Sequence, residues 1–257
     1  MRYDFDIREV SRGQALDMVT AYHYSDTLPK INRHFLGCFL GRDIVGVVTL
    51  GLGTRPRHTI QRLFPSLGSH DYLEIGRMCM TDDMPRNSES QMLSRVVAWI
   101  RANEPGCKVL FTWADGIMGK PGYVYQACSF WYAGFVEGEI YERDGCKLHV
   151  RGMKSLLTSD PNDRRLTVRP TLEQMRELGI RHYKGRQFRY VKLTCGRRER
   201  ARLLAESLVP LTTDYPKDRD LAWREIDLDT GRWHECRKPD IRTDRREGAP
   251  QLQRALF

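Results

Sequence analysis

The stretch KVLFTWADGIMGKPGYVYQACSFWYAGF, from Lys108 to Phe135, decides the fold of this chain. Its apolar beginning predicts a buried strand over 108–114, and Asp115 follows where that strand should end. The glycines and the proline of the next residues predict a loop, after which a short helix is expected to begin near Gly122. One segment therefore holds an acid, a flexible loop and a run of aromatic side chains.

The rest of the chain predicts strands and helices that alternate. Two helices begin with capping boxes, in which a Ser or Thr precedes a Gln by three residues, at Ser11 and at Thr171. Apolar residues at helical spacing predict a further helix from Asn87 or Ser88. The expected strands cover 2–8, 34–40, 43–50, 72–80, 108–114, 133–141, 146–152 and 188–194, and a last helix is expected over 198–208.

This order predicts an α/β (α+β) protein with a mixed, largely antiparallel central sheet flanked by helices, because hairpins surround one strand–helix–strand crossover. We expect three parts along the chain: a catalytic core over 1–160, a basic helix/strand extension over 161–217 that packs on the core, and a polar C-terminal tail over 218–257. Within the tail, residues 237–257 are expected to be extended or disordered.

Composition excludes several classes of protein. The chain has 257 residues, of which 40% are hydrophobic, so it can bury a sizeable core. It has no apolar run near the ~18 residues of a membrane span and no apolar block of a signal peptide, so we expect a cytoplasmic protein without a membrane partner. The seven cysteines form no CxxC pair, which predicts reduced thiols and no metal site.

The net charge of +9 is concentrated in one segment. Nine basic residues and one acid, Glu199, lie between positions 181 and 205. The basic residues are Arg181, Lys184, Arg186, Arg189, Lys192, Arg197, Arg198, Arg200 and Arg202. With aromatic neighbours, such a segment suits a polyanion such as nucleic acid; the alternative is a solvated basic face without a partner.

Asp115 and Tyr125 are the residues of the opening stretch that could carry chemistry. Asp115 follows a central strand, and ligands bind outside the carboxyl ends of strands in open α/β sheets. Its carboxylate would orient or deprotonate an amine, or it caps a helix or turn. Tyr125 would be a general acid, or a half-buried aromatic residue.

Two further pairs of residues have similar alternatives. Glu74 and Arg77 lie three apart on a strand, so their side chains should point to opposite faces. The alternative to a role in the site is an ordinary surface pair. His23 and Ser25 lie at a helix end, where a histidine is more often a C-terminal cap than a base.

Taken in order, these stretches resemble the phage Mom-like DNA modification proteins. The matching residues are His23, Tyr24, Ser25 and Pro29; the hairpin end IVGVVTLG; Glu74 and Arg77; Ala114 and Asp115; and the pattern G-x-x-G-Y-V-Y-Q-A followed by Y-x-G between Gly119 and Gly134. The resemblance covers roughly residues 15–140 and continues more weakly to Asp214–Lys217. It implies a fold like that of GNAT acyltransferases and modification of the exocyclic amine of adenine in DNA, to a carbamoylmethyl-type adduct in the best-known member, which protects phage DNA from restriction.

The chain departs from the family pattern at three places. Many relatives have G-H-x-G at Gly119–Gly122, where this chain has Lys120, and asparagine is common where Ser129 stands. GNAT enzymes hold the pyrophosphate of acetyl-CoA on a turn with two small residues, but 86–91 reads RNSESQ, and Glu89 would repel phosphate. The donor, acetyl-CoA or another activated acyl or glycyl compound, is therefore left open.

These observations predict a transferase that acts on double-stranded DNA and takes its group from a small-molecule donor, with the target base flipped out of the duplex. Asp115, Tyr125 and Ser129 are the expected catalytic residues; His23, Ser25, Glu74, Arg77 and Tyr132 line the pocket; and Arg86, Asn87 and Ser88 form the donor-binding helix start. The expected DNA contacts are Arg55, Arg57, Lys120, Arg181, Lys184, Arg186, Arg189, Arg197 and Arg198, gathered as one cationic ridge beside the groove.

Two other functions remain open. A GNAT-type N-acyltransferase that acts on a small amine, a protein or another hypermodified base would need no basic segment, and its affinity would barely respond to salt. A non-catalytic nucleic-acid-binding protein on a decayed acyltransferase scaffold would explain the missing pyrophosphate turn, but not the grouping of Asp115 and Tyr125.

Overall fold

The computed structural model describes residues 3–25, 28–53, 56–148, 153–160, 162 and 168–242. These residues form one ten-stranded sheet in the order β1-β2-β3-β4-β5-β8-β6-β7, and β9 and β10 extend it from β8. The strands are β1 (Asp6–Glu9), β2 (Asn32–Leu40), β3 (Asp43–Gly51), β4 (Tyr72–Met80), β5 (Val109–Asp115), β6 (Trp131–Arg143), β7 (Cys146–Leu148), β8 (Arg181–Leu193), β9 (Trp223–Ile226) and β10 (Trp233–Cys236). The helices are α1 (Arg12–Tyr22), α2 (Ser88–Asn103), α3 (Tyr123–Ala127), α4 (Lys154–Leu157), α5 (Leu172–Glu177) and α6 (Arg197–Glu206).

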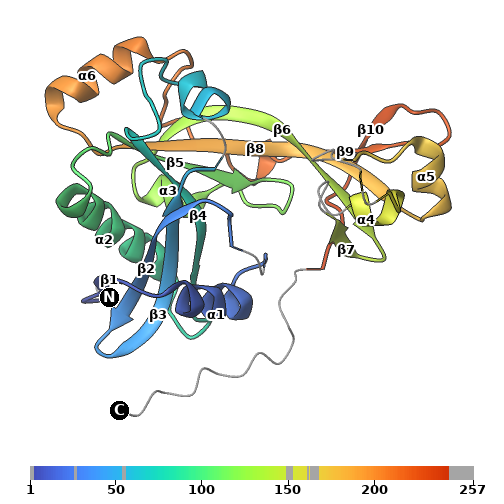
Figure 1. Ribbon diagram of the computed structural model, residues 1–257. Coiled ribbons are helices and arrows are strands. Elements are labelled where there is room, and N and C mark those ends of the chain that lie inside the picture. Colours follow the sequence, from blue (N-terminus) through green and yellow to red (C-terminus); the bar gives the residue numbers. More distant parts are fainter. Residues whose placement is uncertain are drawn as a thin grey trace.

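The sheet opens in its middle, between β4 and β5. These two strands pair in parallel over Tyr72–Glu74 and Val109–Phe111. Beyond this short ladder β4 continues along β3 as far as Met80, and β5 continues along β8 as far as Asp115. The two strands therefore separate toward their carboxyl ends (Figure 1).

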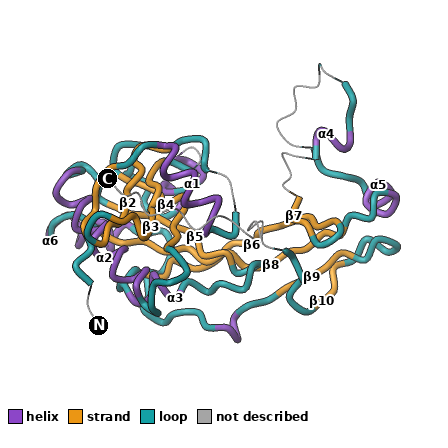
Figure 2. Tube along the Cα trace, turned by 90° about the horizontal axis from the view of Figure 1, so that it is seen from below, coloured by secondary structure: helices purple, strands orange, loops and turns teal. Residues whose placement is uncertain are grey.

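Helices cover both faces of the sheet beside this opening. The apolar side of α2, formed by Met92, Leu93, Val96, Val97 and Ile100, packs in the largest core cluster with residues of β3, β4, β5 and β8. On the other face, α1 packs against β3 and β4 through Ala15, Met18 and Val19. In Figure 2, β6 and β8 run from this region to a second end of the molecule, where β7, β9, β10, α4 and α5 lie.

Elements with a strong local pattern agree with the sequence. The mixed, largely antiparallel sheet is confirmed, because β4 and β5 form the one parallel pair among the described strands. The hairpin of β2 and β3 and the strand 72–80 are confirmed, and both capping boxes are present, at Ser11 and at Thr171.

The C-terminal third differs from the expectation. β8 begins at Arg181 instead of 188, and it lies inside the sheet, between β5 and β6. The expected strand 188–194 matches its second half. The first half was missed because Arg181, Lys184 and Arg186 interrupt the apolar pattern that marks a buried strand. β9 and β10 form a hairpin on β8 within the part predicted to be a polar tail. The division into three parts itself stays a prediction.

A β-bulge at Gly76 changes which face of β4 each side chain joins. The register against β3 shifts between Ile75 and Arg77. Ile75 and Met78 both pack toward the α2 cluster although they are three residues apart, and Cys79 packs against α1. The expectation that Glu74 and Arg77 point to opposite faces is therefore wrong, because an extra residue in a strand reverses the alternation.

Candidate active site

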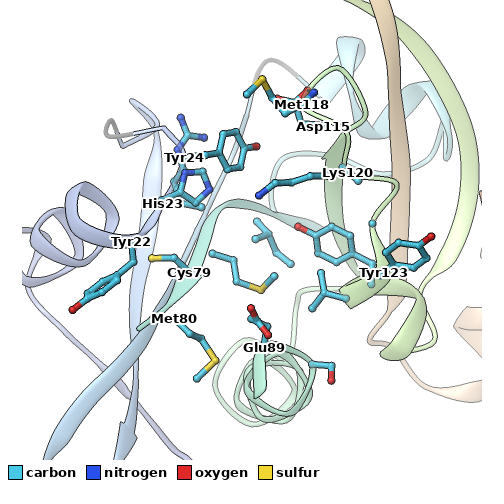
Figure 3. Close-up of a pocket in the computed structure, with 18 of the residues that line it drawn as sticks. Tyr22, His23, Tyr24, Cys79, Met80, Glu89, Asp115, Met118, Lys120 and Tyr123 are labelled. Carbon is cyan, nitrogen blue, oxygen red and sulfur yellow. The ribbon is translucent and has the colours of Figure 1, made fainter. Parts of the chain in front are cut away.

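A groove of about 1000 Å³ lies where β4 and β5 separate. Its walls are the second half of β4, the end of β5, residues 118–122 with α3, the start of α2, and Tyr22–Tyr24 at the end of α1. Figure 3 shows Asp115 and Glu89 at opposite ends of the groove, with Lys120 pointing between them. The pocket expected at the carboxyl end of β5 thus exists in the structure.

Asp115 ends β5 and organises the turn that follows. Its backbone oxygen accepts hydrogen bonds from the amides of Met118 and Lys120, at 3.1 and 3.0 Å. Its Oδ1 atom accepts a further bond from Met118 N at 3.3 Å, and Lys147 Nζ lies 3.8 Å from Oδ2. The side chain is 14% exposed and lines the groove. The backbone oxygen and Oδ1 of Asp115 therefore stabilise the turn, as the alternative interpretation held. The other carboxylate oxygen, Oδ2, lies near Lys147 instead.

Tyr24 faces Asp115 from the other wall (Figure 3), although in the sequence it stands only as one residue of the family pattern. Its ring stacks on His23 with centroids 4.3 Å apart, and Lys120 Nζ lies 4.2 Å from its centroid. Burial, followed by the negative charge of Asp115, raises the pKa of Tyr24 above its usual value, so the phenol stays protonated and can donate a hydrogen bond. The signal was present in the sequence, since Tyr24 stands between the two residues that were singled out.

His23 and Ser25 support this wall rather than reach into it together. His23 is the C-terminal cap of α1, as expected, and its Nδ1 accepts a hydrogen bond from Ser25 N at 3.0 Å. Ser25 Oγ accepts a bond from Arg77 Nη2 at 3.2 Å. His23 and Arg77 line the groove, whereas Ser25 positions Arg77 from behind it.

Tyr125 lines the groove but belongs mainly to the core. It is 8% exposed, and its ring lies 5.5 Å from Phe130 and 5.4 Å from Tyr190, measured between centroids. Thr112 Oγ1 donates to its hydroxyl at 3.2 Å, and burial raises the pKa of the phenol. The packing favours a structural aromatic residue; its role as a general acid stays a prediction.

Ser129 and Tyr132 do not line this groove. Ser129 is exposed in the turn after α3, with a φ of 53°. Tyr132 lies on β6, where its ring packs near Phe188 and Tyr190 and its backbone pairs with Thr212. The sequence placed both near Tyr125 because they are close along the chain, but α3 ends at Ala127 and β6 leads them away.

Glu74 lies apart from the lining residues, at the last β4 position paired with β5. Its Oε2 atom is one of the buried polar atoms of the described residues that have no hydrogen-bond partner. Burial raises the pKa of this carboxyl to about 7, against an opposing effect of the Gly53 amide. A carboxyl with such a pKa is protonated in the folded state at pH values where the unfolded chain has released the proton.

This shift predicts a pH-dependent stability that Glu74→Gln removes. The pKa is raised by folding, so the stabilising contribution is complete below about pH 4.5 and is lost as the pH rises to about 7. Across this window the wild type should lose up to about 3 kcal/mol relative to Glu74→Gln. Denaturant unfolding of both proteins at pH 4.5 and pH 8 measures the difference. Parallel pH profiles would show that Glu74 ionises normally.

The start of α2 does not fit the pyrophosphate turn of GNAT enzymes. Asn87 adopts a left-handed φ of 74°, and Ser88 is buried with its hydroxyl bonded to Pro85 O at 2.7 Å. The amides of Ser88 and Gln91 already donate to the chain, which leaves those of Glu89 and Ser90 to face an anion. Glu89 also lines the groove and would repel phosphate. Arg86 and Asn87 line the groove, and their role in binding the donor stays a prediction.

The basic residues do not form one ridge. Arg197 and Arg198 are exposed on α6, which lies at the amino ends of β4 and β5, since Lys108 before β5 bonds Glu199 at 3.4 Å. Asp115 is the last residue of β5 and therefore lies at the opposite, carboxyl end of this strand. The expectation of a single ridge beside the groove is therefore wrong. Basic residues that are close in sequence are divided between β8 and α6, which place them on different parts of the surface.

The remaining cations lie in several places. Arg181 forms a two-point ion pair with Glu225 of β9, at 2.8 and 3.0 Å. Lys184 and Arg186 lie over the rings of Trp233 and Phe135, at 4.2 and 4.6 Å from the centroids. Arg57 is exposed, Arg189 has a buried Nε atom without a partner, Lys120 lines the groove, and Arg55 lies outside the described residues.

Within the part of the chain that the structure describes, no helix is long and apolar enough to cross a membrane, and no three His, Cys, Asp or Glu side chains are grouped as metal ligands. The seven cysteines are free.

Comparison with known proteins identifies the family. Residues 4–217 match the Mom protein family, so the chain belongs to this family and the resemblance seen in the sequence is confirmed. The methylcarbamoylase mom of Escherichia phage Mu is 32% identical over 211 residues, which cover 82% of this chain and 83% of that protein.

Solved structures resemble the chain more distantly. An N-acetyltransferase from Staphylococcus aureus Mu50 covers 74% of this chain and 97% of its own, with 12% identity and a TM-score of 0.40. A GNAT family acetyltransferase from Streptococcus pneumoniae covers 75% and 100%, with 13% identity and a TM-score of 0.40. Scores at this level support no conclusion about substrate or mechanism.

Proposed function

We propose that this protein is a DNA base-modifying transferase, which adds a small acyl or carbamoylmethyl-type group to the exocyclic amine of adenine and so protects phage DNA from restriction. The observation that carries the proposal is the 32% identity to the methylcarbamoylase mom of phage Mu over most of both chains. The partners are double-stranded DNA and a small-molecule donor, and the place of action is the cytoplasm of the host cell.

The groove supports this proposal by its size and lining. Its volume of about 1000 Å³ is at the upper end of typical ligand pockets, so it can admit a nucleobase and a donor together. The amine of adenine is accessible for group transfer only when the base leaves the stack. The half-exposed ring of Tyr123 offers a flat face for such a base.

The side chains of the groove suggest their roles. Asp115 accepts a hydrogen bond from the adenine amine and takes its proton as the new N–C bond forms. At the same time the bond between the transferred group and the rest of the donor breaks, and the leaving group, the CoA thiolate if the donor is acetyl-CoA, departs with the electron pair. Tyr24, held protonated, donates a hydrogen bond to the transferred group as charge develops on its oxygen. Arg77 and Lys120 supply positive charge for the DNA backbone. The donor is acetyl-CoA or another activated acyl or glycyl compound.

The position of α6 favours a second candidate function. Because its arginines lie away from the groove, an N-acyltransferase that acts on a small amine or a protein would also fit the structure. Such an enzyme would not depend on a polyanion. A titration with duplex DNA at 50 and 200 mM salt separates the two: a DNA enzyme should lose at least about tenfold in affinity, through release of counterions, and the alternative enzyme should show no such loss.

Mass spectrometry of nucleosides tests the proposed function directly. DNA from cells that express the protein should yield a modified deoxyadenosine, and it should resist restriction enzymes whose sites contain adenine. The added mass identifies the group. Only ordinary nucleosides in the digest, from cells with soluble protein, would contradict the proposal. Salt-dependent binding to DNA would then favour a non-catalytic nucleic-acid-binding protein, and its absence would favour the N-acyltransferase.

A further inference from the structure

The end of the described chain, residues 218–242, lies beyond the part that matches the Mom family and yet reaches the groove. β9 pairs with β8 at Tyr183–Gly185, and β10 returns along β9. The chain then runs back toward the end of β5, where Lys238 and Ile241 line the groove. A segment that the sequence marked as a polar tail thus contributes side chains to the candidate active site.

Two contacts attach this segment to the loop 116–122. Ile241 is 8% exposed and packs in a cluster with Ile117, Ile140 and Tyr183. Trp223 Nε1 donates a hydrogen bond to Ile117 O at 3.0 Å. Ile117 follows Asp115 by two residues, so both contacts hold the turn that positions the carboxylate.

The segment is also fixed on its other side. Arg242 N donates to Gly145 O, in the turn between β6 and β7, at 2.8 Å. β7 carries Lys147, whose ammonium lies 3.8 Å from Asp115 Oδ2. The segment therefore bridges the two elements that contact Asp115, instead of lying on one of them.

Lys238 is the charged residue of this segment that lines the groove. Its side chain packs across Gly119: a Cβ atom added to this glycine would lie 3.2 Å from the Cε and Nζ atoms of Lys238. The glycine therefore leaves room for the lysine side chain to cross the loop. The residue is exposed and lines the groove, so its ammonium is available to a ligand. A lysine ammonium is a compact, hydrated point charge that suits a phosphate group.

We propose that the C-terminal segment completes one wall of the active site: Trp223 and Ile241 are positioning residues that hold the loop 116–122, and Lys238 binds a phosphate of the DNA next to the reacting base. The phosphate contact rests on the proposed function, whereas the positioning of the loop does not. Arg237 offers a matched control, because it is an exposed neighbour of Lys238 with the same charge and does not line the groove.

Hydrogen exchange tests the positioning role without any substrate. In Trp223→Phe and in Ile241→Ala, the amides of Met118 and Lys120, which bond Asp115 O, should exchange at least about tenfold faster, while those of α2 keep their rates. Trp223→Phe removes one donor and keeps a ring, so it decides the question even where Ile241→Ala fails to fold. Trp223→Phe should also lower modification while leaving DNA affinity unchanged. Unchanged exchange in the loop would overturn the positioning role.

Salt-dependent binding to duplex DNA tests Lys238. Lys238→Ala should reduce the slope of log affinity against log salt by about 1, and Arg237→Ala should leave the slope as in the wild type. A steep wild-type slope that Lys238→Ala does not change, or that both variants change equally, would overturn the phosphate contact alone. A wild-type affinity for DNA that does not change with salt concentration would overturn this contact together with the proposed function. The positioning role, which hydrogen exchange tests, would not be affected by that outcome.

Discussion

Replacing Asp115 by Asn should reduce modification of adenine by at least about a hundredfold, because general acid–base groups contribute at least about that factor. An amide cannot take the proton of the attacking amine. It retains an oxygen in the place of Oδ1, which accepts the bond from Met118 N, so the turn after β5 should persist. The lost ion pair with Lys147 is long, at 3.8 Å, and should cost less than about 1 kcal/mol.

DNA binding separates this loss from a loss of substrate affinity. Asp115→Asn removes a negative charge from the groove, so affinity for DNA should stay the same or rise. Asp83→Asn makes the same change of charge on an exposed residue outside the groove and should keep full activity. The yield of modified deoxyadenosine, with affinities and melting temperatures of the three proteins, measures the effect. Modification that survives in Asp115→Asn would assign the proton to another group.

Gly122→Ala, which adds one methyl group to the groove wall, should strongly reduce the stability of the protein. Gly122 has a φ of 95°, and an added Cβ would lie 2.6 Å from the ring of Tyr190 and 3.0 Å from the Cβ of Ala114. The left-handed conformation costs a residue with a side chain about 1–2 kcal/mol, and the crowding adds about 1–3 kcal/mol. Tyr190 is fully buried and donates to Pro121 O at 2.5 Å, so it cannot move aside without releasing the loop.

A thermal unfolding series checks this prediction. At about 2–4 °C for each kcal/mol in a chain of this size, Gly122→Ala should melt roughly 4–20 °C lower than the wild type, and its modification activity should fall with the displacement of α3. Gly13→Ala in α1 is the control: its added Cβ would meet only Ser11 Oγ, at 3.8 Å, so alanine should be neutral or stabilise by up to about 1 kcal/mol. Equal melting temperatures for the two variants would contradict the prediction, because they would show that Tyr190 and Ala114 can move to accommodate the added methyl group at little cost in stability.

The sequence predicted the elements whose signals are local. The capping boxes at Ser11 and Thr171, the hairpin of β2 and β3 and the span of β4 depend on residues within one turn or one strand, and the structure has them. The position of Asp115 at the carboxyl end of a central strand follows from the same kind of pattern.

Features set by distant pairing could not be predicted in this way. The place of β8 between β5 and β6 depends on residues about 75 positions away in sequence, such as Trp113 and Arg189. This pairing sends α6 to the amino ends of β4 and β5, away from Asp115. The bulge at Gly76 depends on the pairing of β4 with β3, and the return of Ile241 to the groove depends on its packing against Ile117. Neither contact can be predicted from a local sequence pattern.

The separation of β4 and β5 beyond Glu74 and Phe111 leaves two facing strand edges in the interior of a sheet. Peptide groups along such edges offer donors and acceptors to whatever enters, and every residue type except proline supplies both. Recognition of this kind is indifferent to side-chain identity, so relatives can diverge along these strands while a ligand keeps the same anchoring points. Alanine scanning of the two edges would pass over such contacts; replacing individual peptide bonds by esters would reveal them.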